Sequence, residues 1–316
     1  MAKRRLLLAG TLSAILALLC LDTAVWAQQD EPMNPSPTPA KLKALILDGQ
    51  MVFAGHKWQE TTPAMKTILE SSGRFVVDVF TFPPKGRPND DFCPAFADYQ
   101  VIIMNYEGDP WPEKTRRDFV NFIQQGGGLV VVHAADNAFP DWPEWNEMIG
   151  LGGWGGRDEK AGPMVWWENG KLVYDDSPGP AGYHGEKADW LVTIRSPNHP
   201  ITAGLPEKWL HCCDELYSKL RGPAVNLNVL ATGWQSPQQH GTGRDELCLF
   251  TITYGKGRIF HTTLGHDVAS MSCVGFIVTF QRGAEWAACG SVANTGVPED
   301  FPTPDQTRIR KLIPAL

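Results

Sequence analysis

The chain of 316 residues carries 35 acidic and 28 basic side chains, which gives a formal net charge of −7. No basic cluster after the first few residues is longer than Arg116-Arg117. Because proteins that bind nucleic acid through its phosphates need larger clusters of lysine and arginine, this class of partner is excluded. The roughly 275 residues that follow the N-terminal region suffice for one large α/β domain with its own core.

The N-terminal residues have the pattern of an export signal. A basic start at Lys3 to Arg5 precedes an apolar run from Leu6 to Leu21, and Val25 to Ala27 offers small residues where a signal peptidase cuts. We therefore expect residues 1–27 to be a cleaved signal peptide and the protein to be exported, periplasmic or extracellular, with no stable membrane insertion after cleavage. An uncleaved signal anchor, or a lipid attached at Cys20, is the alternative.

Composition divides the remainder of the chain into three parts. Residues 28–40 are rich in proline and polar groups, so we expect a disordered linker there. A single folded domain is predicted over residues 41–297, and a proline-spaced C-terminal tail over residues 298–316.

The cysteines leave the redox state of the domain open. An even number of cysteines in an exported chain allows disulfides, but spacing alone predicts no pairing. A zinc site made of thiolates is disfavoured because no two cysteines are separated by two residues. The cysteines that follow the signal region are Cys93, Cys212, Cys213, Cys248, Cys273 and Cys289.

The first half of the domain alternates short apolar runs with helical patterns. Helices are predicted from an N-terminal cap at Thr61-Thr62-Pro63 and over Glu113–Gln125. This alternation favours a doubly wound, mostly parallel sheet with right-handed crossovers. The predicted strands are Lys43–Leu47, Phe75–Phe82, Tyr99–Met104 and Leu129–Val132.

Polar side chains follow three of these strands directly. Asp48, Asn105 and His133 each stand where a buried run ends, and His56 lies in the first strand-to-helix loop. Ligands of open parallel sheets bind at the carboxyl ends of the strands, so these residues are site candidates, together with the nearby Tyr106 and Asp136. The alternative for His133 is a hydrogen-bonded core histidine.

Residues 140–189 interrupt the pattern with many glycines and five tryptophans. A long irregular insertion at the active edge of a sheet is typical of a lid or a substrate wall. Tryptophan rings there can stack on sugar rings, which makes Trp154 a candidate for substrate binding, or they can fill the core beneath the loop. The five are Trp142, Trp145, Trp154, Trp166 and Trp167.

The second half of the domain supplies further candidates. Asn198 and His199 lie in a loop rich in proline, and Asp214 and Glu215 stand beside Tyr217. His199 can be a positioned ligand contact or part of a structural turn. His266 and Asp267 follow the last predicted strand. The predicted elements here are strands at Trp190–Ile194, Asn228–Thr232, Leu247–Thr253 and Arg258–Thr263, and a helix over Phe276–Ala288.

These residue types restrict the chemistry. No G-x-S-x-G elbow occurs, so covalent acyl transfer through serine or cysteine is disfavoured. The histidines and carboxylates fit acid–base chemistry or a divalent metal such as zinc held by N and O ligands, although no HExxH motif indicates the metal. Either role requires His56, His133, Glu215 and His266 to converge within about one hydrogen-bond or coordination shell of a common point.

Four ordered motifs, GGGLVVVHAADNAF, PNHPITAGLP, DELY and GKGRIFHTTLGHD, resemble the ThuA-like family of trehalose-utilisation proteins. The resemblance extends from Lys43 to Trp286. It implies a flavodoxin-like sheet of the class I glutamine amidotransferase-like kind in which the amidotransferase cysteine is missing. Val132 to Ala134 then stand at the elbow, and His266-Asp267 stand where that superfamily keeps its histidine and acidic partner.

The resemblance implies an enzyme of glycoside or keto-sugar catabolism, with a small-molecule carbohydrate as its ligand. In this hypothesis His133 and His266 are acid–base groups, Asp267 orients His266, and Asp214 or Glu215 is the second carboxylate. The competing hypothesis is a non-catalytic carbohydrate-binding or scaffold domain. The oligomeric state is not predicted. The residues expected to bind the sugar are His56, Asn105, Tyr106, Asp136, Trp154, Asn198 and His199.

Overall fold

The computed structural model describes residues 40–312. The predicted signal peptide (1–27) lies outside these residues, as do all but the last residue of the predicted linker (28–40). Among the described helices, none combines the length and the apolar character needed to cross a membrane. All six cysteines of this part of the chain are free thiols, and Cys212, Cys248 and Cys273 are buried.

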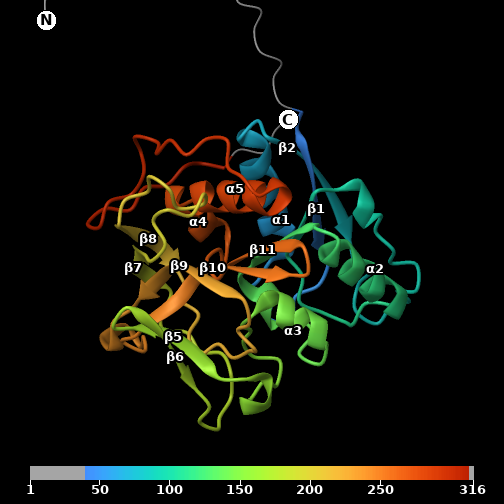
Figure 1. Ribbon diagram of the computed structural model, residues 1–316, viewed down its shortest axis with the longest axis horizontal. Coiled ribbons are helices and arrows are strands. Elements are labelled where there is room, and N and C mark those ends of the chain that lie inside the picture. The colour runs from blue at the N-terminus through green and yellow to red at the C-terminus, as the bar shows by residue number, and fades with distance from the viewer. Residues whose placement is uncertain (1–39, 313–316) are drawn as a thin grey trace, which may run out of the picture. The chain divides into compact units, whose positions relative to one another are not determined.

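One sheet of eleven strands organises the domain (Figure 1). Its first half is parallel and runs in the order β2 (Phe75–Thr81), β1 (Leu42–Asp48), β3 (Val101–Met104), β4 (Gly128–Val132) and β11 (Gly257–Thr262). Its second half is antiparallel and continues through β10 (Asp245–Tyr254), β9 (Leu227–Trp234), β7 (Ala188–Ile194) and β8 (Lys208–Asp214). A side hairpin, β5 (Met164–Glu168) and β6 (Lys171–Asp175), pairs with β10.

The sheet is therefore mixed, and the expectation of a mostly parallel sheet was wrong. After β4 the chain returns to the sheet through hairpins and meanders instead of helical crossovers, and antiparallel neighbours need only such short connections. The turn at Tyr254 to Gly257 joins β10 to β11 in this way.

Helices cover both faces of the parallel half (Figure 1). Ala44 and Ile46 of β1 pack into the cluster that contains α1 (Trp58–Ser71) and α5 (Val274–Cys289). The alternate residues Leu45 and Leu47 pack into the opposite cluster, because successive side chains of a strand point to opposite faces. That second cluster includes residues of α2 (Glu113–Gln124) and α3 (Pro143–Ile149).

Helix α1 begins three residues before the predicted cap, and Pro63 lies inside it. The earlier start places the hydroxyls of Thr61 and Thr62 on the buried side of the helix, where both accept hydrogen bonds of 2.9 Å from the Asn105 amide. The threonines are thus occupied by tertiary hydrogen bonds and do not cap the helix, so local sequence placed its start wrongly.

The insertion is more regular than its composition suggested. Residues 140–189 form α3 and the β5–β6 hairpin, and the unpredicted strand β8 follows them. Trp142 and Trp145 lie fully in the core beside α2, whereas Trp154 is only partly buried. In the tail, the Phe301 ring packs against the ring of Trp209 with their centroids 5.4 Å apart.

Candidate active site

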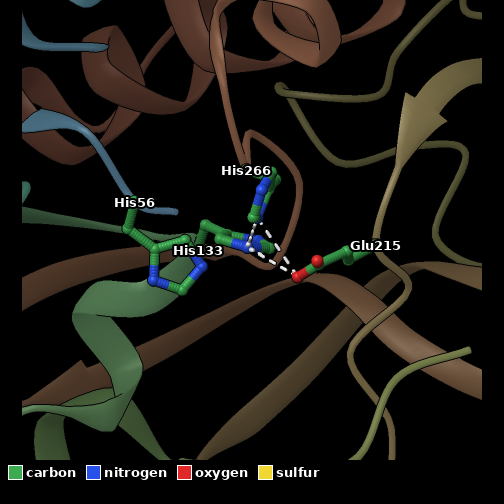
Figure 2. A group of neighbouring side chains, drawn as sticks. All are labelled: His56, His133, Glu215 and His266. Carbon is green, nitrogen blue, oxygen red and sulfur yellow. Dashed lines mark hydrogen bonds and ion pairs between the residues drawn. The ribbon is translucent and has the colours of Figure 1, made fainter. Parts of the chain in front are cut away.

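Three histidines and one glutamate converge beside the ends of four strands (Figure 2). His56 comes from the loop between β1 and α1, His133 directly follows β4, Glu215 directly follows β8, and His266 lies beyond β11. Each offers one nitrogen or oxygen atom, and these atoms lie within 4.8 Å of one another. We call these four residues the His/Glu cluster.

The contacts inside the His/Glu cluster are short. His266 Nδ1 lies 3.1 Å from Glu215 Oε2 and 3.3 Å from His133 Nε2. The distance from His133 Nε2 to the same glutamate oxygen is 3.7 Å. The His56 ring meets the rings of His133 and His266 edge to face, with centroids 5.2 and 4.9 Å away. All four residues are at most 9% exposed, so water screens these contacts poorly.

The backbone fixes which nitrogen of His133 faces the cluster. Its Nδ1 lies 2.6 Å from the carbonyl oxygen of Thr263, and only a protonated Nδ1 can donate to a carbonyl. The neutral ring therefore turns the lone pair of Nε2 toward His266 and Glu215. His133 also has a φ of 45°, which costs a non-glycine residue free energy and is held here by the surrounding structure.

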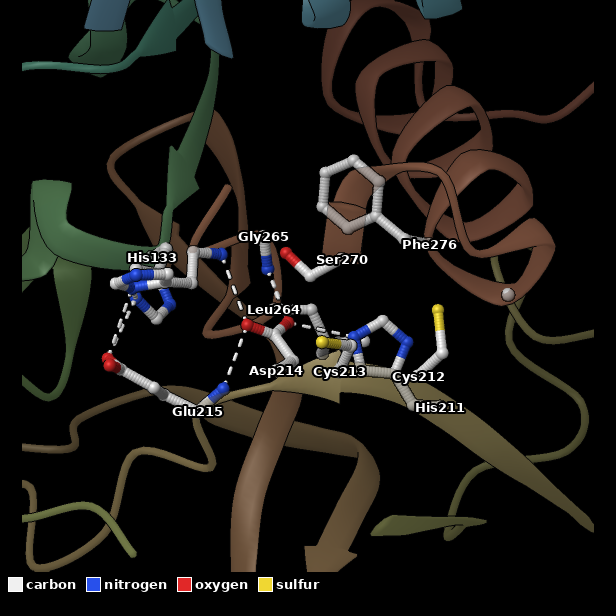
Figure 3. A network of polar contacts seen from close by, with 12 residues as sticks. His133, His211, Cys212, Cys213, Asp214, Glu215, Leu264, Gly265, Ser270 and Phe276 are labelled. Atoms are coloured by element: carbon white, nitrogen blue, oxygen red, sulfur yellow. Dashed lines mark hydrogen bonds and ion pairs between the residues drawn. The ribbon is translucent and has the colours of Figure 1, made fainter. Parts of the chain in front are cut away.

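Asp214 holds the backbone beside the cluster in place (Figure 3). Its carboxylate accepts hydrogen bonds from the backbone N–H groups of Glu215, Gly265 and His266, at 2.9, 2.8 and 3.2 Å. A fourth contact, of 2.8 Å, joins it to His211 Nε2. Both of its oxygens are thus engaged away from the cavity, and Asp214 fixes the backbone of two cluster members.

Burial and neighbouring charges set the protonation of the cluster. Burial, followed by the nearby imidazole of His133, lowers the pKa of His56 to about 3. Burial alone would raise the pKa of Glu215, but hydrogen bonds and charge interactions with His133 and His266 lower it overall. The pKa of His133 is raised, because the hydrogen bond to Glu215 and the charge of Asp214 outweigh its burial. Glu215 is therefore an ionised carboxylate at neutral pH.

A cavity of about 410 Å³ opens onto the cluster. His56 and Glu215 reach it from the cluster side. Aromatic side chains supply much of its wall, and the ring of Trp154 lies 4.6 Å from that of Tyr217. The aromatic lining residues are Phe53, Phe139, Trp154 and Tyr217, and the other polar ones are Glu107, Asn137 and His184.

Several predicted site residues have other contacts. Asp267 caps the short helix α4 (Val268–Met271) and pairs with Lys187, so Glu215 is the carboxylate beside His266. The hydroxyl of Tyr106 donates to the carbonyl of Asp109 inside the core. The sequence alone did not predict these contacts. Whether a side chain caps a helix or bonds inside the core depends on the local backbone conformation, which its sequence neighbours do not specify.

Three further candidates lie away from the cavity. Asp136 is fully buried, with one carboxylate oxygen 3.4 Å from His261 Nε2. Asn198 and His199 lie in the loop after β7, and His199 packs on Trp286 with ring centroids 5.0 Å apart. The Trp286 carbonyl accepts from Arg258 at the start of β11, so His199 is at the opposite end of the sheet from His266.

Sequence reasoning missed Glu107, Asn137 and His184 as cavity residues. Glu107 lies directly after Asn105 and Tyr106 at the end of β3, so its position at the functional edge of the sheet could have identified it. No comparable pattern marks His184, whose Nε2 lies 3.8 Å from Glu215 Oε2 because the insertion folds back over the cavity.

Glu107 predicts a pH-dependent stability. Burial raises its pKa to about 7 from an ordinary 4.5, nearby Asp136 adds to this, and Arg157 opposes it. The folded protein thus keeps a proton that the unfolded chain loses, and stability falls as the pH rises from about 4.5 to 7. Glu107→Gln removes this loss. In urea titrations, the unfolding free energy of Glu107→Gln minus that of the wild type should be about 2–3 kcal/mol larger at pH 8 than at pH 5. If the difference in unfolding free energy between the two proteins is the same at pH 5 and pH 8, the pKa of Glu107 is not raised in the folded protein.

Comparisons of this chain with a family model and with solved structures agree with one another. A family model described as trehalose utilisation, ThuA, matches residues 43–287. The crystal structure of a ThuA-like protein from Parabacteroides merdae ATCC 43184 is 46% identical and has a TM-score of 0.83, covering 86% of this chain and 98% of that one. A ThuA-like protein from Bacteroides uniformis ATCC 8492 shares the fold at 19% identity and a TM-score of 0.55, covering 82% and 98%. No curated protein matches.

Proposed function

This chain belongs to the ThuA family of trehalose utilisation, and from that premise we propose that it is an enzyme acting on a disaccharide, glycoside or keto-sugar. The sugar binds in the 410 Å³ cavity, and the reaction takes place where the cavity meets the His/Glu cluster. The observation that carries the proposal is that one cavity joins an aromatic wall to two members of the buried His/Glu cluster, His56 and Glu215.

The wall suits a sugar ring. The faces of tryptophan and tyrosine rings pack well against the C–H faces of sugars, and Trp154 and Tyr217 present such faces in this cavity. The volume lies within the range of about 300–1,000 Å³ that is common for small-molecule sites. Asn137, Glu107 and His184 supply polar groups for the sugar hydroxyls.

The cluster suits proton transfer. His133 and His266 are the acid–base pair of the proposal, and Glu215 takes the place beside His266 that sequence reasoning gave to Asp267. Asp214 acts as a positioning residue. Glu107 is a second carboxyl group in the cavity, and a pKa of about 7 lets it exchange a proton near neutral pH. No step requires a covalent serine or cysteine nucleophile.

Two finer features belong to the same proposal. The strand order β2-β1-β3-β4-β11, with helices on both faces, supports a flavodoxin-like parallel half of the amidotransferase-like kind. The basic and then apolar pattern of residues 1–27 supports a site of action outside the cytoplasm, on sugars available there.

Product analysis with the wild-type protein tests the proposed function. Trehalose, other disaccharides and their 3-keto forms are incubated with the full chain, with and without added zinc, and products are followed by chromatography. We expect at least one sugar of this panel to be converted. Saturable quenching of tryptophan fluorescence by a sugar, with no product after long incubation, would overturn the proposal in favour of a carbohydrate-binding or scaffold domain.

A further inference from the structure

The geometry of the His/Glu cluster points to a bound divalent metal ion: we propose that His56, His133, Glu215 and His266 coordinate one zinc ion beside the cavity. Three imidazole nitrogens and one carboxylate oxygen form a donor set that zinc and related transition metals bind in proteins. This inference rests on the proposed function and deepens it: with zinc bound, His133 and His266 act as ligands instead of as an acid–base pair, and the ion, by taking a fifth ligand, would polarise an oxygen of the sugar or activate a water molecule.

The distances fit tetrahedral coordination. Two ligands that each lie about 2.0–2.1 Å from a tetrahedral ion are about 3.3 Å from one another. His266 Nδ1 lies 3.1 Å from Glu215 Oε2 and 3.3 Å from His133 Nε2. The distance from His133 Nε2 to Glu215 Oε2 is 3.7 Å. Three of the donors therefore already surround a common point at the spacing that an ion requires.

Lone pairs of nitrogen and oxygen atoms point toward the place proposed for the ion. Because Nδ1 of His133 donates to the Thr263 carbonyl, the neutral ring that a metal ion requires presents a bare Nε2 to the cluster. Glu215 adds a carboxylate oxygen, and His266 adds a third acceptor unless its Nδ1 carries a proton. Acceptors that face one another in a buried place repel unless a cation lies between them.

His56 supplies independent support. It is 8% exposed, and its Nδ1 is buried without any hydrogen-bond partner among the described residues. The other ring nitrogen lies 3.4 Å from the Tyr217 hydroxyl, at the margin of a hydrogen bond. An imidazole left so poorly satisfied in a buried site is explained if one of its nitrogens binds an ion.

The surroundings hold the ligands as metal sites require. The Thr263 carbonyl orients His133, and the Asp214 carboxylate fixes the backbone of Glu215 and His266. Such supporting hydrogen bonds set the direction of the ligands and the tautomer of the rings. His133 also keeps its unfavourable φ of 45°, a strain typical of functional positions.

Metal analysis of the full chain tests this inference. The protein is stripped with a chelator, dialysed against zinc, and measured by mass spectrometry of the metal and by titration calorimetry. We expect about one zinc per chain with a dissociation constant below micromolar. His133→Ala and the isosteric Glu215→Gln should each weaken binding at least 100-fold, and circular dichroism checks that both variants fold. Anomalous diffraction at the zinc edge should place the ion at the cluster and not at a free thiol.

His240→Ala is the matched control. This histidine also contacts a glutamate, at 3.2 Å from Glu186, but its side chain is 71% exposed and lies outside the cluster. The control should keep one zinc at wild-type affinity. The inference is overturned if the wild type takes up no zinc at the cluster, or if folded Glu215→Gln binds as tightly as wild type; a shared proton then holds the cluster together. Sugar conversion without zinc would leave the proposed function intact, and zinc binding without any conversion would leave the metal site intact.

Discussion

Replacing Asp214 by asparagine is expected to lower the free energy of unfolding by about 3–5 kcal/mol, the usual cost of breaking a buried charged pair. The carboxylate is fully buried and accepts three backbone N–H groups besides its contact with His211. An asparagine keeps one oxygen but turns an NH₂ group toward N–H donors, so at least one buried donor loses its acceptor.

The charge adds to this cost. Burial alone would lower the pKa of His211, but Cys273 and Asp214 raise it overall, which favours the protonated ring. Asparagine removes the negative charge that favours the protonated ring. Because the freed N–H groups belong to Glu215 and His266, the variant should also lose the alignment of the His/Glu cluster.

Urea unfolding of the wild type and of Asp214→Asn measures this effect. Asp189→Asn is the control, since Asp189 also accepts a backbone N–H group, from Cys213 at 2.8 Å, but is exposed. We expect the control to lose no more than about 1 kcal/mol. Equal losses in the two variants would show that Asp214 is an ordinary hydrogen-bond acceptor and that its buried network does not hold the site.

The parallel half of the fold could be predicted because its signals are local. Each of β1, β3 and β4 is a short apolar run that ends in a polar residue, and these parallel neighbours therefore bring Asp48, Asn105 and His133 to one edge. The antiparallel half could not be predicted as well. Most of its strands were expected, but a strand pattern does not show whether a strand pairs parallel or antiparallel, and β8 was hidden among the cysteines around His211.

The candidate site shows the same division. His133 and His266 became candidates because they follow buried strands, and the structure places their rings 5.3 Å apart, centroid to centroid. The roles expected for two carboxylates from their sequence neighbours differ from their contacts. Asp267 caps a helix, and Asp214 accepts hydrogen bonds from backbone N–H groups. A carboxylate's neighbours in the sequence do not show which way its side chain points.

His133→Ala is expected to lower kcat/KM about 1,000-fold on a sugar that the wild type converts. Loss of a positioned acid–base group costs about 10²–10⁴ in rate, and loss of a metal ligand in the same place has an effect at least as large. His133 has both a ring nitrogen directed at the cluster and a fixed second nitrogen, so no neighbouring residue can replace it. His266→Ala should have an effect of similar size, since His266 contacts both His133 and Glu215.

The role of the His/Glu cluster is therefore tested by the kcat/KM of wild type, His133→Ala and His199→Ala on the same converted sugar. His199 was also expected to bind substrate, but it lies at the far end of the sheet beside Trp286. We expect a loss of about 1,000-fold for His133→Ala and a change of less than about twofold for His199→Ala. Wild-type activity in His133→Ala, or an equal loss in both folded variants, would contradict the claim that the His/Glu cluster is the catalytic centre.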